Sequence, residues 1–363
     1  MTHYLVSSYS LLHVIEGHSS TGPAEKQKED NDSHNDIWAC EFEPKGPDDT
    51  MTSDIMALCG ANNVLMLDVA QGRYVKKYSH PEPAEVFYCL AWTTLTSVDL
   101  TEDTEIRGQS CNILAVAGRI GSIKLLNPLQ NECYRYLFGH QKEVLKLTFS
   151  KSRPRWLFSA SADMTVRLWD IGTPTSKDDD SICFAKFTLP SVSEIPCAVY
   201  PAIDLSSVIV GCSNGTMARY NLLPKILNWL TERCENRDLN MTTVTPTMIY
   251  PRGDEWHEGY VDDVYIIGHE HYDDPLDGYI VSRGSDDMEV IVWDPKTSKP
   301  SEVDIAISLR WPWSEEESGL RFKIIKSSLL AITAAMFGFL ILAMAFAAKH
   351  FQITAKKHLN LQR

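Results

Sequence analysis

The sequence predicts an all-β fold in which several small antiparallel sheets are arranged in a ring, a β-propeller. Two observations carry this prediction. A β-prone stretch, a tight turn, a second β-prone stretch and a closing Asp or Asn recur five times, and a further strand-like segment precedes most copies. Repeats with a basic unit of roughly 40–45 residues are typical of blades with four strands. Because such units bury their apolar faces only against neighbours, they have to pack side by side.

The five copies differ in how closely they follow the pattern, and polar inserts lengthen the spacing between them. They span residues 57–68, 115–127, 158–170, 210–221 and 281–294. With the strand-like segments that precede them, they predict blades near residues 34–80, 84–138, 140–188, 195–250 and 260–310. We assign residues 1–326 to the propeller.

The third copy carries the full signature of a WD repeat, a Gly-His pair followed by Ser, Asp and Trp-Asp. The indole N–H of Trp169 can donate to the Ser159 hydroxyl, which meets His140, which Asp163 orients. Each buried polar group then has a partner. These residue types also build Ser-His-Asp catalytic sets. In a WD repeat we interpret His140, Ser159, Asp163 and Trp169 as a structural tetrad, and we predict no catalytic residue.

The charge is acidic and unevenly distributed. The formal net charge is -14, which argues against direct, charge-driven binding to nucleic acid. Seven of the 34 Lys and Arg residues lie within residues 321–363, a stretch without Asp or Glu, whereas all 48 acidic residues precede it. The predicted propeller is therefore more acidic than the whole chain, and we expect its partners to be proteins.

Cysteines and short motifs exclude several other classes. The nine cysteines are odd in number and form no Cys-x-x-Cys pair, which indicates reduced thiols of a cytosolic or nuclear protein. The N-terminus has no secretory signal pattern. No phosphate-binding loop or dinucleotide turn is present, so we expect no cofactor. Residues 268–274, with His257 nearby, are rich in His and Asp, but we interpret them as a solvated loop and predict no metal site.

The C-terminal part departs from the repeat pattern. Residues 327–348 are uncharged and mostly apolar and have basic residues on both sides, which predicts a transmembrane helix followed by a basic tail at 349–363. A second interpretation stays open, because the repeat pattern predicts the second half of another blade at this position. Codons available for residues 332–344 permit such a half, with Trp and Asp, in a neighbouring reading frame. The tail would then be a frame-shifted or alternatively spliced end.

Residues 37–44, 86–92, 114–118 and 139–172 resemble a known family, the WD domain of leucine-rich repeat and WD repeat-containing protein 1, which is associated with the origin recognition complex. The chain is also similar to the Polycomb WD protein embryonic ectoderm development. The resemblance covers residues 4–326 and is most specific over 84–172. It implies a WD40-type β-propeller, seven-bladed in the family, whose last blades are incomplete here. The leucine-rich repeats of the family have no counterpart in this sequence.

The resemblance also implies a function. It indicates a nuclear, non-catalytic scaffold that binds origin recognition complex subunits and methylated histone H3 and H4 tails, in support of DNA replication and heterochromatin. In the Polycomb relative an aromatic cage holds methyl-lysine, and two cage positions fall on Trp38 and Tyr88 here. The other half of the cage falls on Ser318 and Gly319, which are not aromatic. The aromatic residues nearby are Trp311 and Trp313.

An alternative function follows from the tail. A propeller with one C-terminal transmembrane span is similar in layout to an endoplasmic-reticulum WD protein that acts as an exchange factor for a small GTPase. If residues 327–348 span a membrane, we expect a single-pass membrane protein that serves as a trafficking scaffold or exchange factor.

Overall fold

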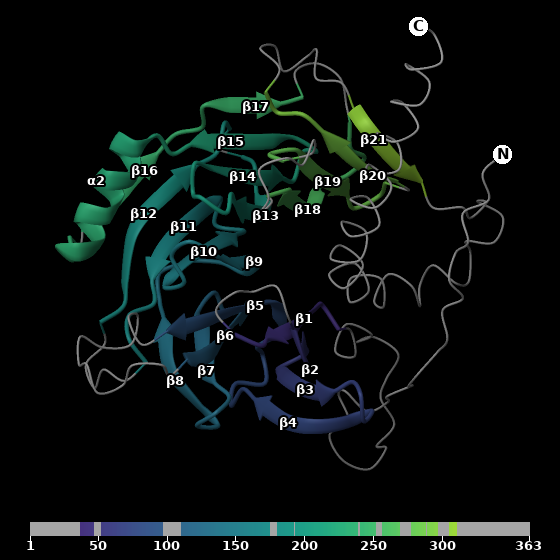
Figure 1. The fold of residues 1–363 in the computed structure, drawn as a ribbon, viewed down its shortest axis with the longest axis vertical. Coiled ribbons are helices and arrows are strands. Elements are labelled where there is room, and N and C mark those ends of the chain that lie inside the picture. Colours follow the sequence, from purple (N-terminus) through teal and green to yellow (C-terminus); the bar gives the residue numbers. More distant parts are fainter. Residues whose placement is uncertain are drawn as a thin grey trace, which may run out of the picture.

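The computed structural model describes residues 37–46, 52–96, 110–174, 180–191, 193–238, 240–251, 256–268, 277–287, 289–296 and 305–310. Within these ranges five mainly antiparallel sheets follow one another around an arc, each with one strand towards the middle and one at the outside (Figure 1). The predicted fold class, an all-β propeller of WD type, is confirmed. The predicted apolar helix at 327–348 lies outside the described ranges. In the described part of the chain, no helix is both long and apolar enough to cross a membrane.

Each blade takes its strands from one stretch of the chain. The first blade contains β1 (Ala39–Pro44), β2 (Thr52–Gly60), β3 (Asn63–Asp68) and β4 (Arg73–Ser79). The second contains β5 (Phe87–Thr96), β6 (Ser110–Gly118), β7 (Ile123–Asn127) and β8 (Glu132–Leu137). The third contains β9 (Val144–Phe149), β10 (Trp156–Ser161), β11 (Thr165–Asp170) and β12 (Ile182–Thr188).

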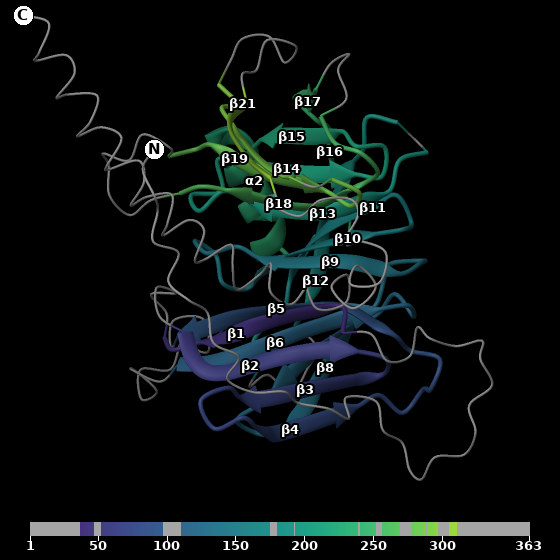
Figure 2. The ribbon, with the colours of Figure 1, turned by 90° about the vertical axis from the view of Figure 1, so that its right-hand side faces the viewer.

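The fourth blade contains β13 (Pro196–Pro201), β14 (Ser207–Cys212), β15 (Met217–Asn221) and β17 (Met248–Tyr250). The fifth contains β18 (Val261–Ile266), β19 (Ile280–Gly284), β20 (Glu289–Trp293) and β21 (Ile305–Arg310). The first strands β1, β5, β9, β13 and β18 lie next to one another in that order. Viewed at right angles, the sheets of the first two blades lie together below the other three (Figure 2).

Burial changes from the middle of a blade to its outer edge. All six residues of β10 and all six of β14 are buried, because each of these strands lies in a sheet covered on both faces by neighbouring blades. The outer strand β4 of the first blade exposes most of its residues. Separate apolar clusters therefore lie between successive blades, and the sheets differ mainly in their outer strands.

A register shift near the start of the first strand recurs in four blades. The residues passed over by the pairing are Tyr88, Leu145, Cys197 and Asp262. A bulge of this kind redirects the side chain of the extra residue. In the first blade, Trp38 occupies the equivalent place, since its N–H donates to the Cys59 carbonyl just before Ala39 pairs with Cys59. Trp38 and Tyr88 are thus matched positions of adjacent blades.

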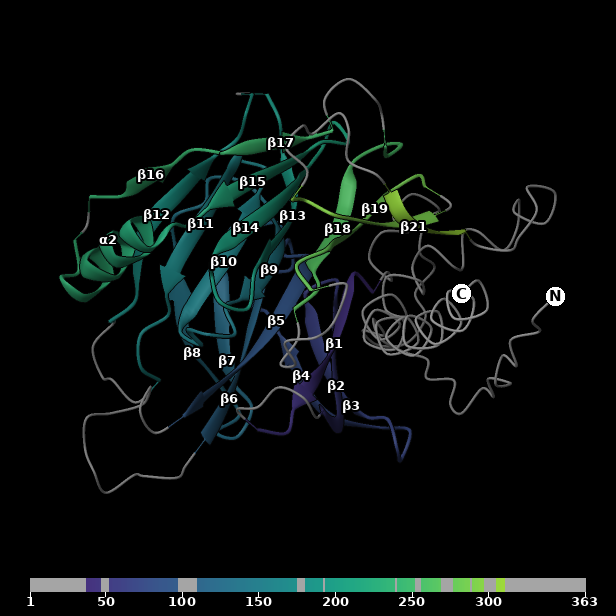
Figure 3. The ribbon, with the colours of Figure 1, turned by 45° about the horizontal axis from the view of Figure 1, so that its top comes forward.

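One helix and one extra strand were not predicted. After β15 the chain forms α2 (Pro224–Glu235) and β16 (Thr242–Val244), and β16 pairs in parallel with β12 of the third blade. That sheet therefore has five strands, and its outer edge is covered. Figure 3 shows α2 beside β12 and β16 at the outside of the propeller. Leu230 is buried, and Ile226 and Leu227 pack against the same apolar cluster.

The second blade contains a buried ion pair. Glu85 and Lys124 are 0% and 2% exposed and form a salt bridge. Glu85 also accepts a hydrogen bond from the backbone N–H of Ile120 at 3.1 Å, and the Lys124 ammonium donates to the Ser122 carbonyl at 3.1 Å. Removing one partner would leave the other charge without compensation in a dry site.

We predict that Lys124→Met lowers the free energy of unfolding by about 3–5 kcal/mol, because it strands the Glu85 carboxylate. The double variant Glu85→Leu/Lys124→Met loses less, since no buried charge remains. Urea denaturation followed by circular dichroism measures both. Lys225→Met on the exposed start of α2 is the control and should change stability by less than about 0.5 kcal/mol. A single variant as stable as this control would contradict the prediction.

Candidate functional site

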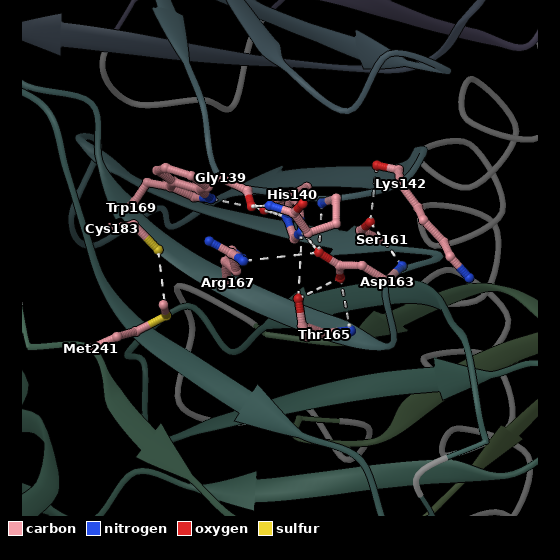
Figure 4. A network of polar contacts seen from close by, with 12 residues as sticks. Gly139, His140, Lys142, Ser161, Asp163, Thr165, Arg167, Trp169, Cys183 and Met241 are labelled. Carbon is pink, nitrogen blue, oxygen red and sulfur yellow. Dashed lines mark hydrogen bonds and ion pairs between the residues drawn. The ribbon is translucent and has the colours of Figure 1, made fainter.

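The structure brings the four predicted tetrad residues of the third blade into one chain of hydrogen bonds. Figure 4 labels His140, Asp163 and Trp169 of this chain. Trp169 Nε1–H donates to Ser159 Oγ at 2.8 Å, and Ser159 Oγ lies 2.7 Å from His140 Nε2. His140 Nδ1 lies 2.9 Å from Asp163 Oδ2. With the proton on Nδ1, His140 donates to the carboxylate and accepts from the serine hydroxyl, so each polar atom has a suitable partner.

Burial and the hydrogen bonds set the protonation of this group. Burial lowers the pKa of His140 below its ordinary value, although Asp163 acts in the opposite direction. Burial alone would raise the pKa of Asp163, but hydrogen bonds from His140, Thr165 and the Gln141 N–H outweigh it and hold the pKa well below its ordinary value. The resting state is therefore a neutral imidazole beside a carboxylate.

This arrangement differs from a catalytic triad in access. Ser159 is 0% exposed, and its oxygen is already engaged by Trp169 and His140. A nucleophile must be able to approach a reacting atom to about 3–3.5 Å. These hydrogen bonds instead link the turn before β9 to β10 and β11, which is a structural role.

A second tetrad lies in the fifth blade, and the sequence interpretation missed it. His257 bonds Asp287 through Nδ1 and Ser282 Oγ through Nε2 at 2.8 Å, and Trp293 Nε1–H donates to Ser282 Oγ at 3.1 Å. His257 is only 5% exposed. From the sequence, His257 was noted only as a residue near the polar stretch 268–274, and its place in a tetrad was not predicted.

The spacing of the fifth copy could have revealed this second tetrad. From Ser159, Asp163 and Trp169 follow after 4 and 10 positions, whereas from Ser282, Asp287 and Trp293 follow after 5 and 11. One additional residue in the turn accounts for both differences. The histidine was harder to recognise because it follows Trp256 and not a glycine.

The two predicted cage residues lie against each other. The rings of Trp38 and Tyr88 are edge to face, with centroids 5.3 Å apart and planes at 80°. Arg119 Nε–H donates to the Tyr88 hydroxyl at 3.3 Å, while Trp38 Nε1 is buried and has no hydrogen-bond partner in the described structure. Positions 311, 313, 318 and 319, predicted to contribute to the other half, lie outside the described ranges.

Metal and thiol chemistry find little support in the described part of the chain. No group of His, Cys, Asp and Glu residues there is placed to hold a metal ion, and residues 269–274 lie outside it. All nine cysteines are free. Burial raises the pKa of the Cys197 thiol to about 11, which keeps it protonated and unreactive near neutral pH.

Comparison with known families assigns this WD propeller to one of them. Residues 8–223 match the family described as leucine-rich repeat and WD repeat-containing protein 1, WD domain, and the match covers the first three blades and most of the fourth. The chain belongs to this family. The family resemblance predicted from the sequence is thereby confirmed.

Individual relatives agree with this assignment. The chain is 31% identical over 206 residues to leucine-rich repeat and WD repeat-containing protein 1 of Homo sapiens, a match that covers 56% of this chain and 30% of that protein. The Xenopus laevis protein is 28% identical over 218 residues, covering 60% of this chain and 28% of the relative. Polycomb protein esc of Drosophila melanogaster is 33% identical over 120 residues, covering 32% and 26%. The matches thus span less than a third of each relative.

Solved structures support the fold. A chain in the crystal structure of polycomb repressive complex 2 from Chaetomium thermophilum superposes with a TM-score of 0.53 at 18% identity, covering 72% of this chain and 49% of that one. In a second structure that complex is bound to trimethylated histone H3, and the TM-score is 0.55 at 16% identity, covering 76% and 59%. At these identities the likeness concerns the fold alone.

We predict that Trp169→Phe and Trp293→Phe each lower the free energy of unfolding by about 1–3 kcal/mol, because each removes the N–H that satisfies a buried serine oxygen. Chemical denaturation measures the loss. Trp229→Phe on α2 is the matched control, since Trp229 is 41% exposed, and should change stability by less than about 0.5 kcal/mol. Equal effects in all three variants would argue against a stabilising relay.

A pH dependence follows from His140. Its pKa is lowered in the folded state, so below the ordinary value of 6.5 the unfolded chain binds a proton that the folded chain does not. Stability contributed by this residue is therefore fully present above 6.5 and declines as the pH falls. In His140→Gln the decline should be shallower. Parallel stability curves of the two proteins between about pH 8 and 5, roughly 1.5 units either side of the ordinary histidine pKa, would contradict this prediction.

Proposed function

We propose that this chain is a non-catalytic WD-repeat scaffold that reads lysine methylation on histone tails and binds the origin recognition complex. In this role it acts on nuclear chromatin, in support of replication initiation and heterochromatin. The observation that carries the proposal is the pair of aromatic rings at matched positions of adjacent blades, Trp38 and Tyr88. Membership of the family supports the wider role.

The perpendicular rings suit a methylated ammonium group. Trimethyl-lysine keeps its positive charge but cannot donate a hydrogen bond, so it is bound by the faces of aromatic rings and not by carboxylates alone. Two rings at 80° form a corner that can contact one cation on two sides. The hydrogen bond from Arg119 holds the Tyr88 ring in its orientation.

The charge of the propeller suits a basic peptide. All 48 acidic residues of the chain precede residue 321, and the formal charge of the whole is -14. A negative surface accelerates the encounter with Lys- and Arg-rich segments and repels the phosphates of nucleic acid. One solved relative by fold is a chromatin complex bound to trimethylated histone H3, which is consistent with this choice of ligand.

We predict that Trp38→Ala or Tyr88→Ala weakens binding of a trimethyl-lysine histone peptide by more than about 1 kcal/mol, or roughly five- to ten-fold, because each removes one ring face. Fluorescence anisotropy with trimethylated and unmodified peptides measures the effect. Trp229→Ala, which removes an exposed aromatic ring from α2, is the control and should bind normally. Unchanged affinity in both cage variants, with normal thermal unfolding, would remove the cage from the proposal.

A membrane-tethered role is the second candidate, and the apolar run at residues 327–348 favours it. Fractionation of cells with N-terminally tagged protein separates the two roles. Enrichment on chromatin together with release by alkaline carbonate supports the reader. Resistance to carbonate extraction without a nuclear pool supports a trafficking scaffold or exchange factor and contradicts the chromatin proposal.

A further inference from the structure

A cavity lies between the first and second blades, away from the tetrads. Its volume is about 250 Å³, and most of its lining residues come from the end of β4, the two residues after it and the strands β7 and β8. Apolar side chains of both blades form its interior, and four ring-bearing residues contribute to its walls: Tyr78, His80, Phe87 and Tyr136. Phe87 directly precedes Tyr88 in the chain, but neither ring of the Trp38–Tyr88 pair lines the cavity.

The rings around this cavity continue onto the surface. His80 contacts both Phe87 and Tyr136 edge to face, with centroids 6.0 and 6.5 Å apart. Tyr136 stacks on Phe138 with centroids 6.1 Å apart and planes at 11°. Phe138 is 74% exposed, an unusual position for a phenylalanine. The cavity therefore has an exposed aromatic rim as well as an aromatic wall.

One polar atom in the wall lacks a partner. The hydroxyl of Tyr78 is buried and makes no hydrogen bond within the described structure. Burial raises its pKa, so this phenol stays protonated and able to donate. Buried polar groups are nearly always paired, and an unpaired one indicates that something else supplies the partner.

The strand β4, which forms part of the cavity wall, is basic. Strand β4 carries Arg73, Lys76 and Lys77 without an acidic residue, in a chain whose net charge is -14. Lys77 lines the cavity, and no carboxylate of the described structure pairs with it. Lys124, which also lines the cavity, is already paired with Glu85. The uncompensated charge is therefore at the rim, where a ligand would enter.

The volume limits what can bind. Pockets for cofactors and drug-sized ligands are about 300–1,000 Å³, and this cavity is smaller. A cavity of this size takes one anchoring side chain of a partner, as central pockets of protein interfaces do. We propose that the cleft between the first two blades docks an acidic peptide segment of a partner protein, with an aromatic side chain in the cavity and carboxylates beside Lys77 and its strand neighbours.

A nucleic-acid strand is a less suitable occupant. Aromatic rings and basic residues also bind single strands, but such sites follow the phosphate backbone along a positive groove, whereas here the positive charge is confined to one short strand of an acidic protein. The small volume of the cavity further favours a single anchoring side chain over stacked bases. The proposed site does not depend on the methyl-lysine cage.

The test uses the full chain and a fluorescein-labelled peptide of eight residues, a Phe flanked by Asp and Glu, in anisotropy titrations. We expect this peptide to bind at least about ten-fold more tightly than the same peptide with Ala in place of Phe. Lys77→Glu and Tyr136→Ala should each weaken binding about ten-fold, because they remove the charge and the ring of the rim.

Matched controls come from α2. Lys225→Glu and Trp229→Ala change an exposed lysine and an exposed aromatic ring elsewhere and should leave peptide binding unchanged, as should Trp38→Ala. Equal affinity for the Phe and Ala peptides, or equal losses in the α2 controls, would overturn the proposal. Competition by a single-stranded oligonucleotide at lower concentration than the peptide would also overturn it, in favour of a nucleic-acid site. Lys77→Glu is the decisive variant, since its exposed side chain can be replaced without disturbing the core.

Discussion

The structure depends on one constraint, that the middle strands of each blade are apolar on both faces. A sheet of this kind leaves apolar surface in water unless a neighbour covers each side. In β10 and β14 every residue is buried, which is achieved only by packing of consecutive blades. Polar groups caught in this packing must find partners within the protein. The Trp-Ser-His-Asp tetrads of the third and fifth blades and the Glu85–Lys124 pair of the second blade each supply such partners.

The same packing produces the functional surfaces. Because the first strands of the blades lie next to one another, residues at equivalent positions meet, although they are far apart in the chain. Trp38 and Tyr88 are separated by 50 positions, yet their rings are in contact. The cavity between the same two blades is lined by β4 of one blade and by β7 and β8 of the next. A propeller thus offers sites at the seams between rigid sheets, where side chains are positioned by two blades at once.

Much of the fold and part of the candidate site could be predicted from the sequence. The repeats identified the sheets, and the third copy identified four residues that the structure joins by hydrogen bonds. The tetrad around His257 escaped because a single additional residue in a turn shifts the spacing. Helix α2 and strand β16 were not predicted because a repeat pattern describes what the blades share, and this insertion occurs in one blade only. The apolar residues of this insertion are explained only by the apolar cluster of the third and fourth blades that they cover.

The sequence by itself determined the class of fold, the family and the four tetrad residues of the third blade, because these depend on local patterns of residue type and spacing. Only the tertiary structure decided which of those residues contact one another and that Ser159 is inaccessible. It also decided that the charge of Lys124 is paired with Glu85, whereas the Tyr78 hydroxyl has no hydrogen-bond partner in the described structure. These properties depend on the neighbours contributed by other blades. Whether a side chain is buried or paired depends on residues far away in the sequence, and a sequence pattern does not give the distances between such residues in space.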